Sequence, residues 1–482
     1  MLDLRPVGFV IGLVVAVLGV TMLVPLAVDL LDGNRQWPAF GQSAAIASGL
    51  GTLVALTCAN GVRDRLTLQQ IFLVATGVWV VLPLFGAVPF VLGATDARAV
   101  DAVFEAMSGL TTTGATVFVK LETLPRGLLL WRSMLQWFGG IGIIIVAMVF
   151  LPELRVGGMQ IFRSEAFDTG GKVLPRAAEI AARIAAVYVA LTVACHVAYV
   201  IVGMDGFEAL NHALTTMSTG GFSTSDASFG AYQGVPEYVA SVFMVLASLP
   251  FVRYVQIAAG STRPLLRDSQ VRAFLWVIAA LVVVLTAYRV IANHDHAEHA
   301  FREALFNVTS IITGTGYASV DYQLWGTFPV VLFFFIGLVG GCAGSTCCSV
   351  KIFRYQILIA AVAAQIRRIH TPSGIFPLRQ PGQPVGAEVL NSVMAFVGIF
   401  VTMLGLTAAA LGLAGLDFVT ALSGAATALA NVGPGLGDII GPAGNFAALN
   451  DTAKWILILA MLLGRLELLV VMVIFLPRFW RG

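Results

Sequence analysis

Ten long apolar segments restrict what this chain can fold into. A helix that crosses a bilayer needs about 20 mostly apolar residues. The segments of that kind are 7–30, 40–60, 69–93, 127–151, 179–203, 235–260, 272–292, 326–349, 389–415 and 453–476. Charged residues make up only 11% of the chain and hydrophobic residues 58%, a balance that excludes an ordinary soluble enzyme. No small-residue cleavage site follows the first segment, so we expect it to be retained as a span. The sequence therefore predicts an all-α polytopic membrane protein in a lipid bilayer.

The charges between these segments divide by side. If the N-terminus is cytoplasmic, the inner connections and the C-terminus carry these basic residues: Arg63, Arg65, Arg155, Arg163, Lys172, Arg176, Arg263, Arg267, Arg272, Lys351, Arg354, Arg367, Arg368, Arg379, Arg478 and Arg481. The outer connections carry these acids: Asp96, Asp101, Glu105, Glu122, Asp205, Glu208, Asp226, Glu237, Asp295, Glu298, Glu303, Asp321, Asp417, Asp438 and Asp451. The positive-inside rule then places both termini in the cytoplasm. A negative outer face would raise the local concentration of cations.

Four of the outer connections share one plan. Each starts with an acidic residue and a short amphipathic run and then turns at a glycine: "DAVFEAMSGLTTTGATVF" (101–118), "DGFEALNHALTTMSTGGFST" (205–224), "AEHAFREALFNVTSIITGTGYAS" (297–319) and "LDFVTALSGAATALANVGPGLGD" (416–438). Aligned on the glycine, the turns contain Thr112, Thr113 and Gly114; Ser218, Thr219 and Gly220; Ile312, Thr313 and Gly314; Asn431, Val432 and Gly433. This recurrence predicts diverged copies of one unit of about a hundred residues.

Non-helical chain at membrane depth is tolerated only where it is buried in protein or lines a water-filled cavity. Glycine permits positive φ angles that help to aim successive carbonyls the same way, and a ring of carbonyl oxygens can replace the hydration shell of an alkali cation. Each short helix would also direct the negative end of its dipole at the pore. We therefore predict that the four turns form a cation selectivity filter. The alternative is four re-entrant loops with no role in conduction.

The four loops, "TTGAT", "STGGF", "ITGTG" and "NVGPG", resemble those of the Trk/Ktr/HKT superfamily of potassium transporters, most closely the bacterial Trk-type membrane subunit. The resemblance covers essentially the whole chain. It implies two extra transmembrane helices and then four helix–pore-loop–helix repeats around one central pore: 1–62 for the extra helices, and 63–160, 161–262, 263–370 and 371–482 for the repeats.

In this superfamily the first glycine of each loop governs selectivity, and glycine at all four positions fits the potassium-permeable pattern. The first loop departs from the pattern of a potassium channel because Ala115 and Thr116 stand where a channel has Tyr and Gly. Only the fourth loop continues to a proline, Pro434. We therefore expect an asymmetric filter.

The segment "GLVGGCAGSTCCSVKIFR" (337–354) is unusually rich in small residues. Each glycine costs a helix about 1 kcal/mol relative to alanine, so a break is expected in the stretch that contains Gly340, Gly341, Ala343, Gly344, Ser345, Thr346 and Ser349. The resemblance implies an intramembrane loop that obstructs the pore below the filter, with Lys351 at its inner end. The alternatives are close helix packing through small residues and, for Lys351, snorkelling to the membrane interface. Relatives often have glycine where this chain has Cys347 and Cys348, which leaves the position of the hinge open.

Arg465 lies near the middle of the last apolar segment. A charge at that depth costs several kcal/mol unless it faces protein or water, and Glu467 would point elsewhere on a helix. We predict that Arg465 faces the pore below the filter and forms an electrostatic barrier to cations, which matches the arginine of the fourth repeat in the superfamily. The alternative is an ion pair with an acid on another helix.

Together these features predict a potassium-permeable, channel-like uptake protein with K⁺ as the transported ion. The rival interpretation is a secondary K⁺ symporter coupled to Na⁺ or H⁺. The sequence contains no GxxxxGK[ST] nucleotide-binding motif, and we expect no organic cofactor and no nucleic-acid partner. The resemblance implies a cytoplasmic nucleotide-binding regulatory subunit, a homodimeric membrane part and a bacterial inner-membrane location. An intramembrane enzyme that uses Cys342, Cys347 or Cys348 is disfavoured because no histidine accompanies them; small packing residues are the simpler interpretation of these cysteines.

Overall fold

The computed structural model describes residues 2–61, 66–146, 173–374, 376–377, 379–380 and 383–480. This part of the chain is almost entirely helical, which confirms the predicted all-α class. Within it, seven helices or continuous helix pairs are long and apolar enough to cross a membrane, and one bent pair can supply an eighth span. Several of the basic residues assigned to the inner side lie outside the described residues: Arg63, Arg65, Arg155, Arg163, Lys172 and Arg481.

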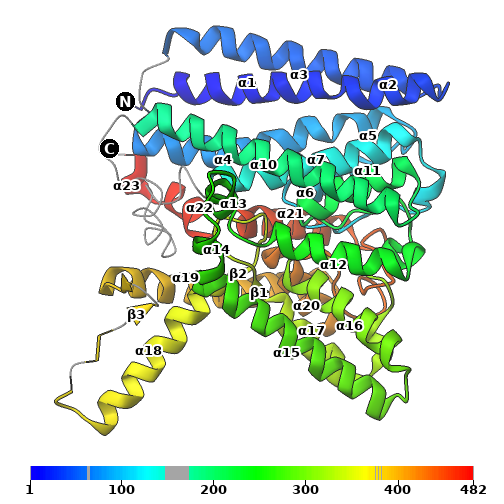
Figure 1. The fold of residues 1–482 in the computed structure, drawn as a ribbon. Helices are drawn as coiled ribbons and strands as arrows, with labels where there is room; N and C mark the ends of the chain where they lie inside the picture. The colour runs from blue at the N-terminus through cyan, green and yellow to red at the C-terminus, as the bar shows by residue number, and fades with distance from the viewer. Residues whose placement is uncertain are drawn as a thin grey trace.

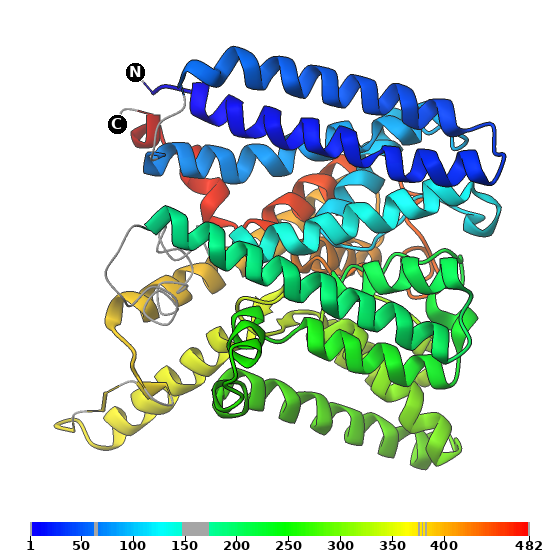
Figure 2. The same ribbon diagram turned by 45° about the horizontal axis from the view of Figure 1, so that its top comes forward.

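A helical hairpin at the N-terminus lies on the outside of the bundle (Figures 1 and 2). Its two arms pack closely because a methyl group at Gly12 would come within 2.7 Å of the Gly51 carbonyl oxygen. The elements of the hairpin are α1 (Arg5–Thr21), α2 (Leu23–Leu31), α3 (Trp37–Cys58) and the 3₁₀ turn η1 (Ala59–Gly61).

The remaining elements recur in the order long helix, short helix and second helix, and we call the short helix of each unit its pore helix after the role predicted for it. The first unit contains α4 (Leu68–Gly86), α5 (Val88–Leu92), pore helix α6 (Ala99–Leu110), η2 (Leu121–Thr123) and α7 (Arg126–Ile145). The second contains α10 (Val173–Ile201), pore helix α11 (Gly206–Met217), η5 (Ser228–Tyr232), α12 (Val235–Ala247), α13 (Phe251–Ala258) and α14 (Arg263–Arg267).

The third unit contains α15 (Ser269–Ala292), pore helix α16 (Ala297–Ile312), η6 (Tyr322–Trp325), α17 (Thr327–Gly337), β1 (Val339–Gly340), β2 (Val350–Lys351) and α18 (Ile352–His370). The fourth contains β3 (Arg379–Gln380), β4 (Gln383–Pro384), α19 (Ala387–Leu413), pore helix α20 (Phe418–Ala430), α21 (Asp451–Arg465), α22 (Leu469–Ile474) and α23 (Pro477–Trp480). The residue boundaries of the repeats remain predictions.

Two strand pairs interrupt the helices. β1 and β2 are parallel, and β3 and β4 are antiparallel. The first pair closes the non-helical stretch between α17 and α18, and the second joins α18 to α19. Figure 1 shows that α18 extends away from the body and that both chain termini lie at one end of the helices.

The second helices of the last three units are broken. The break between α17 and α18 was expected, but the apolar segments 235–260 and 453–476 were wrongly predicted as continuous spans. α12 and α13 meet at 90°, because Pro250 has no amide hydrogen to donate and disfavours the helical conformation of the residue before it. α21 ends at Arg465, and positive φ angles of 57° at Glu467 and 40° at Leu468 separate it from α22.

Backbone groups at the helix break in the second unit form hydrogen bonds with groups at the break in the third unit. The Ala247 carbonyl accepts hydrogen bonds from the amide and hydroxyl of Thr346, at 3.3 and 3.0 Å. The Ser248 carbonyl accepts one from the Cys342 amide at 3.1 Å, and the Phe251 amide donates to the Gly344 carbonyl at 2.9 Å. Backbone groups freed at membrane depth are therefore paired inside the protein, as a bilayer requires.

Candidate ion filter and gate

The four pore helices end in turns with one shared backbone conformation. A left-handed residue follows each helix at Thr112, Thr219, Gly314 and Asn431, with φ angles of 52°, 50°, 76° and 52°. The next amide donates to the carbonyl five positions earlier at 2.9–3.1 Å, in the pairs Thr113–Ser108, Gly220–Thr215, Thr315–Ser310 and Val432–Thr427. This is the Schellman arrangement that ends many helices. It establishes which residues of the four loops are equivalent.

The equivalence corrects the alignment on the first glycine. Two positions after each left-handed residue lies a second residue with positive φ: Gly114, Gly221, Gly316 and Gly433, at 82°, 76°, 82° and 91°. Gly220 and Gly314, which the alignment paired with Gly114, lie one and two positions too early. Gly314 occupies the left-handed position that threonine or asparagine holds in the other loops. The predicted turn residues of the third loop are shifted accordingly, and Ile312 is the last residue of α16.

The equivalent glycines join the four loops into a closed ring. A methyl group at Gly114 would lie 2.2 Å from the Gly220 carbonyl oxygen, and one at Gly221 would lie 1.9 Å from that of Thr315. The same contact joins Gly316 to Val432 at 2.0 Å and Gly433 back to Thr113 at 2.7 Å. In the first three loops, the glycine therefore packs against a carbonyl of the next loop along the chain. In the fourth loop, the glycine packs against a carbonyl of the first loop. Only glycine fits so close an approach at these φ angles.

One cavity of about 210 Å³ lies against this ring and is lined by all four ring glycines, Gly114, Gly221, Gly316 and Gly433. Asp226 lies in its wall, where the carboxylate accepts the amides of Lys120 and Leu121 at 2.7 and 3.0 Å. Nearby, Glu122 accepts the Ser225 hydroxyl at 2.6 Å, and this hydrogen bond lowers the pKa of the Glu122 carboxyl. These two carboxylates tie the first loop to the second beside the cavity.

A buried ion pair holds the first loop. Glu105 on α6 and Arg132 on α7 have side chains that are 0% and 1% exposed, with Nε and Oε1 2.8 Å apart. Arg132 also donates to the Thr116 hydroxyl at 3.2 Å and to the Ser223 carbonyl at 2.8 Å. It therefore connects the first loop to the second.

Corresponding side chains on the other pore helices serve the same purpose: His212 and Asn307 are equivalent to Glu105, whereas Ser423 lies one position before the equivalent residue, Gly424. His212 bonds to the Ser223 hydroxyl at 3.1 Å. Asn307 donates to the Ser319 hydroxyl at 3.0 Å and accepts the Ser319 amide at 3.3 Å. In the fourth loop, Ser423 accepts the Leu436 amide at 2.9 Å. Each pore helix thus holds the chain that returns from its own turn.

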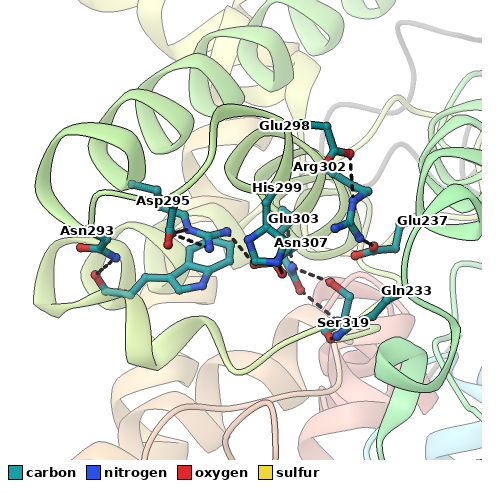
Figure 3. A network of polar contacts seen from close by, with 12 residues as sticks. Gln233, Glu237, Asn293, Asp295, Glu298, His299, Arg302, Glu303, Asn307 and Ser319 are labelled. Atoms are coloured by element: carbon teal, nitrogen blue, oxygen red, sulfur yellow. Dashed lines mark hydrogen bonds and ion pairs between the residues drawn. The ribbon is translucent and has the colours of Figure 1, made fainter.

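Figure 3 shows this contact in the third loop, with Asn307 and Ser319 facing one another. The Ser319 carbonyl also accepts a hydrogen bond from the side-chain Nε2 of Gln233 at 3.2 Å. One turn before Asn307, the carboxylate of Glu303 lies 2.6 Å from a guanidinium nitrogen of Arg289 and 2.7 Å from Nε2 of His299. The exit of the third loop is therefore fixed to the second unit and to its own pore helix.

Three acids that were expected in open outer connections are buried instead. Glu105, Glu237 and Glu303 are 0%, 0% and 3% exposed, and they pair with Arg132, Arg302 and Arg289. The reason is that they lie on the faces of helices that pack against protein. They contribute to holding the loops and not to a negative surface.

The non-helical stretch 338–351 lies directly against the turns. The Cys348 sulfur is 3.7 Å from the Thr112 hydroxyl, and the Thr346 hydroxyl is 3.2 Å from that of Thr219. Gly340 is needed here because a methyl group would lie 2.1 Å from the Cys348 carbonyl oxygen. The predicted gate residues Gly340, Gly341, Ala343, Gly344, Ser345 and Thr346 all belong to this stretch, which we call the gate loop (338–351).

Arg465 reaches the same place from the end of α21. It is 2% exposed, and it donates to the Gly139 carbonyl at 2.9 Å, to the Thr346 carbonyl at 3.4 Å and to the Cys348 sulfur. No carboxylate pairs with it in the described part of the chain, so the alternative of an ion pair with an acid is wrong there. Its Nε has no partner. Among the described residues, no acid neutralises the positive charge of this guanidinium beside the gate loop.

The charged side chains near Arg465 each have a partner. Glu467 pairs with the fully buried Arg354 of α18, across the break between α21 and α22. Lys351 is 8% exposed and donates to the Cys347 carbonyl, so it does not snorkel to the interface. The amine is turned back into the gate loop because that loop supplies the acceptor.

Cys347 and Cys348 take part in polar contacts and are not packing residues alone. All five are free; Cys347 donates to the Ser248 hydroxyl at 2.8 Å, and Cys348 accepts from Arg465. Within the described residues, no group of histidine, cysteine and acidic side chains could hold a metal ion.

Several residues of the site were missed from the sequence. Gln136 donates to the Gly220 carbonyl at 2.6 Å and accepts the Phe222 amide at 3.0 Å, so α7 supports the second loop as well as the first. Arg132 could have been found, because a charged residue in an apolar segment marks a functional position by default. Gly221 and Gly316 carried no comparable signal.

Comparisons with known proteins identify the family. The profile of the TrkH family, described as a cation transport protein, matches residues 38–481. The Trk system potassium uptake protein TrkI of Halomonas elongata is 44% identical over 99% of this chain and 97% of its own length. TrkH of Escherichia coli, another Trk system potassium uptake protein, is 34% identical over 99% of both chains. The crystal structure of the potassium transporter TrkH from Vibrio parahaemolyticus covers both chains completely, with a TM-score of 0.91 and 31% identity. These relatives are transporters and not enzymes, and the chain belongs to the TrkH family of multi-pass membrane cation transport proteins.

Proposed function

We propose that this protein takes up K⁺ by passive conduction through the ring of four loops. One observation carries the proposal: the ring glycines contact neighbouring carbonyls in a closed circle and line one cavity. The pore helices end at this ring, so the negative ends of their dipoles favour a cation there. Carbonyl oxygens can then replace the water that a K⁺ ion sheds. The potassium uptake proteins among the relatives support this choice of ion.

The gate loop and Arg465 supply the barrier on the inner side of the ring. The loop contacts Thr112 and Thr219 at the turns, and Arg465 adds a positive charge that repels the ion. Conduction requires that the loop and the arginine leave this position. The membrane potential then drives K⁺ inward, with about 2.3 kcal/mol per charge for each 100 mV.

We also propose the assembly and location that the resemblance implies. These are a bacterial inner membrane with both termini in the cytoplasm, a homodimeric membrane part and a cytoplasmic nucleotide-binding regulatory subunit. The extended helix α18 follows the gate loop directly, so a subunit docked on α18 could pull the loop away. The second candidate, K⁺ symport with Na⁺ or H⁺, is favoured by the break in α21–α22, because broken helices line the substrate sites of secondary transporters.

The test is rubidium flux into liposomes that contain the full-length protein, with and without competing sodium. We expect uptake that follows an imposed membrane potential in the absence of ion gradients other than Rb⁺; an absolute requirement for a Na⁺ or H⁺ gradient would instead establish symport. A matched pair of variants tests the ring. Gly316→Ala should abolish flux, because its methyl group meets the Val432 carbonyl oxygen at 2.0 Å.

Gly314→Ala is the control, because the nearest atoms to its methyl group would be 3.7 Å away and other loops hold non-glycine residues at this position. It should keep most of the flux. The opposite ranking of the two variants would contradict the ring. Absence of flux from both the wild type and an Arg465→Met variant, which lacks the barrier, would contradict the proposed function.

A further inference from the structure

A second cavity, of about 220 Å³, lies apart from the ion ring. Its walls come from α1, α4 and α7 and from Leu110, the last residue of α6. The wall is apolar apart from Thr21, whose hydroxyl already donates to the Leu18 carbonyl at 2.7 Å. An apolar cavity of this kind offers water no partners and stays dry. A cavity on the order of 150 Å³ is enough to bind benzene.

The cavity shares two wall residues with the gate. Trp79 and Gly139 line it, and both hold Arg465. The Gly139 carbonyl accepts the arginine at 2.9 Å, and the guanidinium lies 5.3 Å from the centre of the Trp79 ring. A molecule in the cavity would therefore pack against groups that fix the gate arginine.

The cavity also borders the membrane. Its lining residues lie near the middle of two stretches long enough to span the bilayer, α1 continued by α2 (Arg5–Leu31) and α4 continued by α5 (Leu68–Leu92), and Val17 in the wall is 55% exposed. The medium outside such a wall is made of acyl chains. Lipid tails are as apolar as the cavity, so the hydrophobic effect does not drive a tail into it. The favourable free energy of binding comes instead from the van der Waals contacts that the wall atoms lack when the cavity is empty.

We propose that this cavity binds one acyl chain of a bilayer lipid, and that the bound chain stabilises Arg465 in its barrier position. The first part concerns binding alone. The second part rests on the proposed function, because it requires Arg465 to act as a barrier to ions.

The experiment uses the full-length protein in liposomes that contain a phosphatidylglycerol with a diazirine at the middle of one acyl chain. After irradiation, mass spectrometry locates the adducts. We expect adducts on Leu18 and Leu110, which are 4% and 3% exposed and lie beyond the reach of lipid at the protein surface. Val78→Phe places a ring in the cavity, and labelling of these leucines should fall about tenfold.

Val80→Phe is the matched control, because Val80 is on the same helix, is 39% exposed and does not line the cavity. Its labelling should equal that of the wild type. In rubidium flux, Val78→Phe should act as a permanent occupant and lower basal uptake about fivefold, the lower end of usual coupling between sites, while Val80→Phe leaves it unchanged.

Absence of adducts on Leu18 and Leu110 in the wild type, or equal labelling in Val78→Phe, would overturn the binding site. Loss of labelling with unchanged flux in Val78→Phe would overturn the link to Arg465. Labelling as expected in the wild type, with no rubidium flux from either the wild type or Arg465→Met, would contradict the proposed function and leave the acyl-chain site standing.

Discussion

Arg132 and Arg465 are two buried arginines on the second helices of the first and fourth units, and they are 1% and 2% exposed. Arg132 meets the carboxylate of Glu105. Among the described residues, Arg465 meets carbonyls, a sulfur and an aromatic ring, and no carboxylate. Both lie in the protein interior, where the paired arginine is neutralised and ties loops together, whereas the one without an acid partner among the described residues leaves a net charge beside the gate loop. Under the proposed function, the partner, and not the burial, separates a structural arginine from a barrier to ions.

The largest effect is expected from Arg132→Leu. Removal of one partner leaves Glu105 buried without a counter-charge, which costs about 3–5 kcal/mol. The thermal midpoint of unfolding should fall sharply, as measured by size-exclusion chromatography of heated samples. Replacement of both charges, with Glu105→Met added, should recover part of the loss because no unpaired charge remains. A wild-type midpoint for the single variant would show that the pair does not hold the loops.

Arg465→Met should act on flux and not on stability. It removes the charge but keeps most of the volume, so the basal rubidium flux should rise about tenfold or more at an effective dielectric constant of about 20. Arg465→Lys is the control, because it preserves the charge and should keep the flux low. Unchanged basal flux in Arg465→Met would remove the functional half of the comparison.

A third buried arginine sharpens the comparison. Arg354 is paired, like Arg132, but with Glu467 beside the gate. Glu467→Gln should lower the unfolding midpoint less than Arg132→Leu, for a cost of about 1–3 kcal/mol, and should raise basal flux moderately because the break after Arg465 loosens. Glu388→Gln, at an exposed acid on α19, is the control. Equal behaviour of the two variants would mean that Glu467 does not position the break.

The smallest effect is expected from Arg98→Ala. Arg98 pairs with Asp101 and Asp451, but its side chain is 60% exposed, and water screens such pairs. Neither the unfolding midpoint nor the flux should change measurably. A clear loss of either would show that pairing alone, without burial, gives an arginine its structural role.

The fold class and the parts of the site were predictable from the sequence because their signals are local. Long apolar segments predict transmembrane spans wherever they occur. Polar, glycine-containing turns between the spans indicate pore loops, and the small residues at 340–346 indicate a helix break. Arg465 was found because a charge in an apolar segment is costly anywhere. Each of these signals can be read without knowledge of a neighbour.

The tertiary structure alone decided which glycines form the ring and which charges are paired. Gly316 and not Gly314 closes the third loop, because the carbonyl that it meets belongs to Val432 of the next unit. Glu105 is a structural acid because it meets Arg132 across two helices, and Arg465 is free of acids because Glu467 turns to Arg354. Such contacts join residues that are tens to hundreds of positions apart, as Thr113 and Gly433 are where the ring closes, so they depend on helix packing and leave no pattern along the chain.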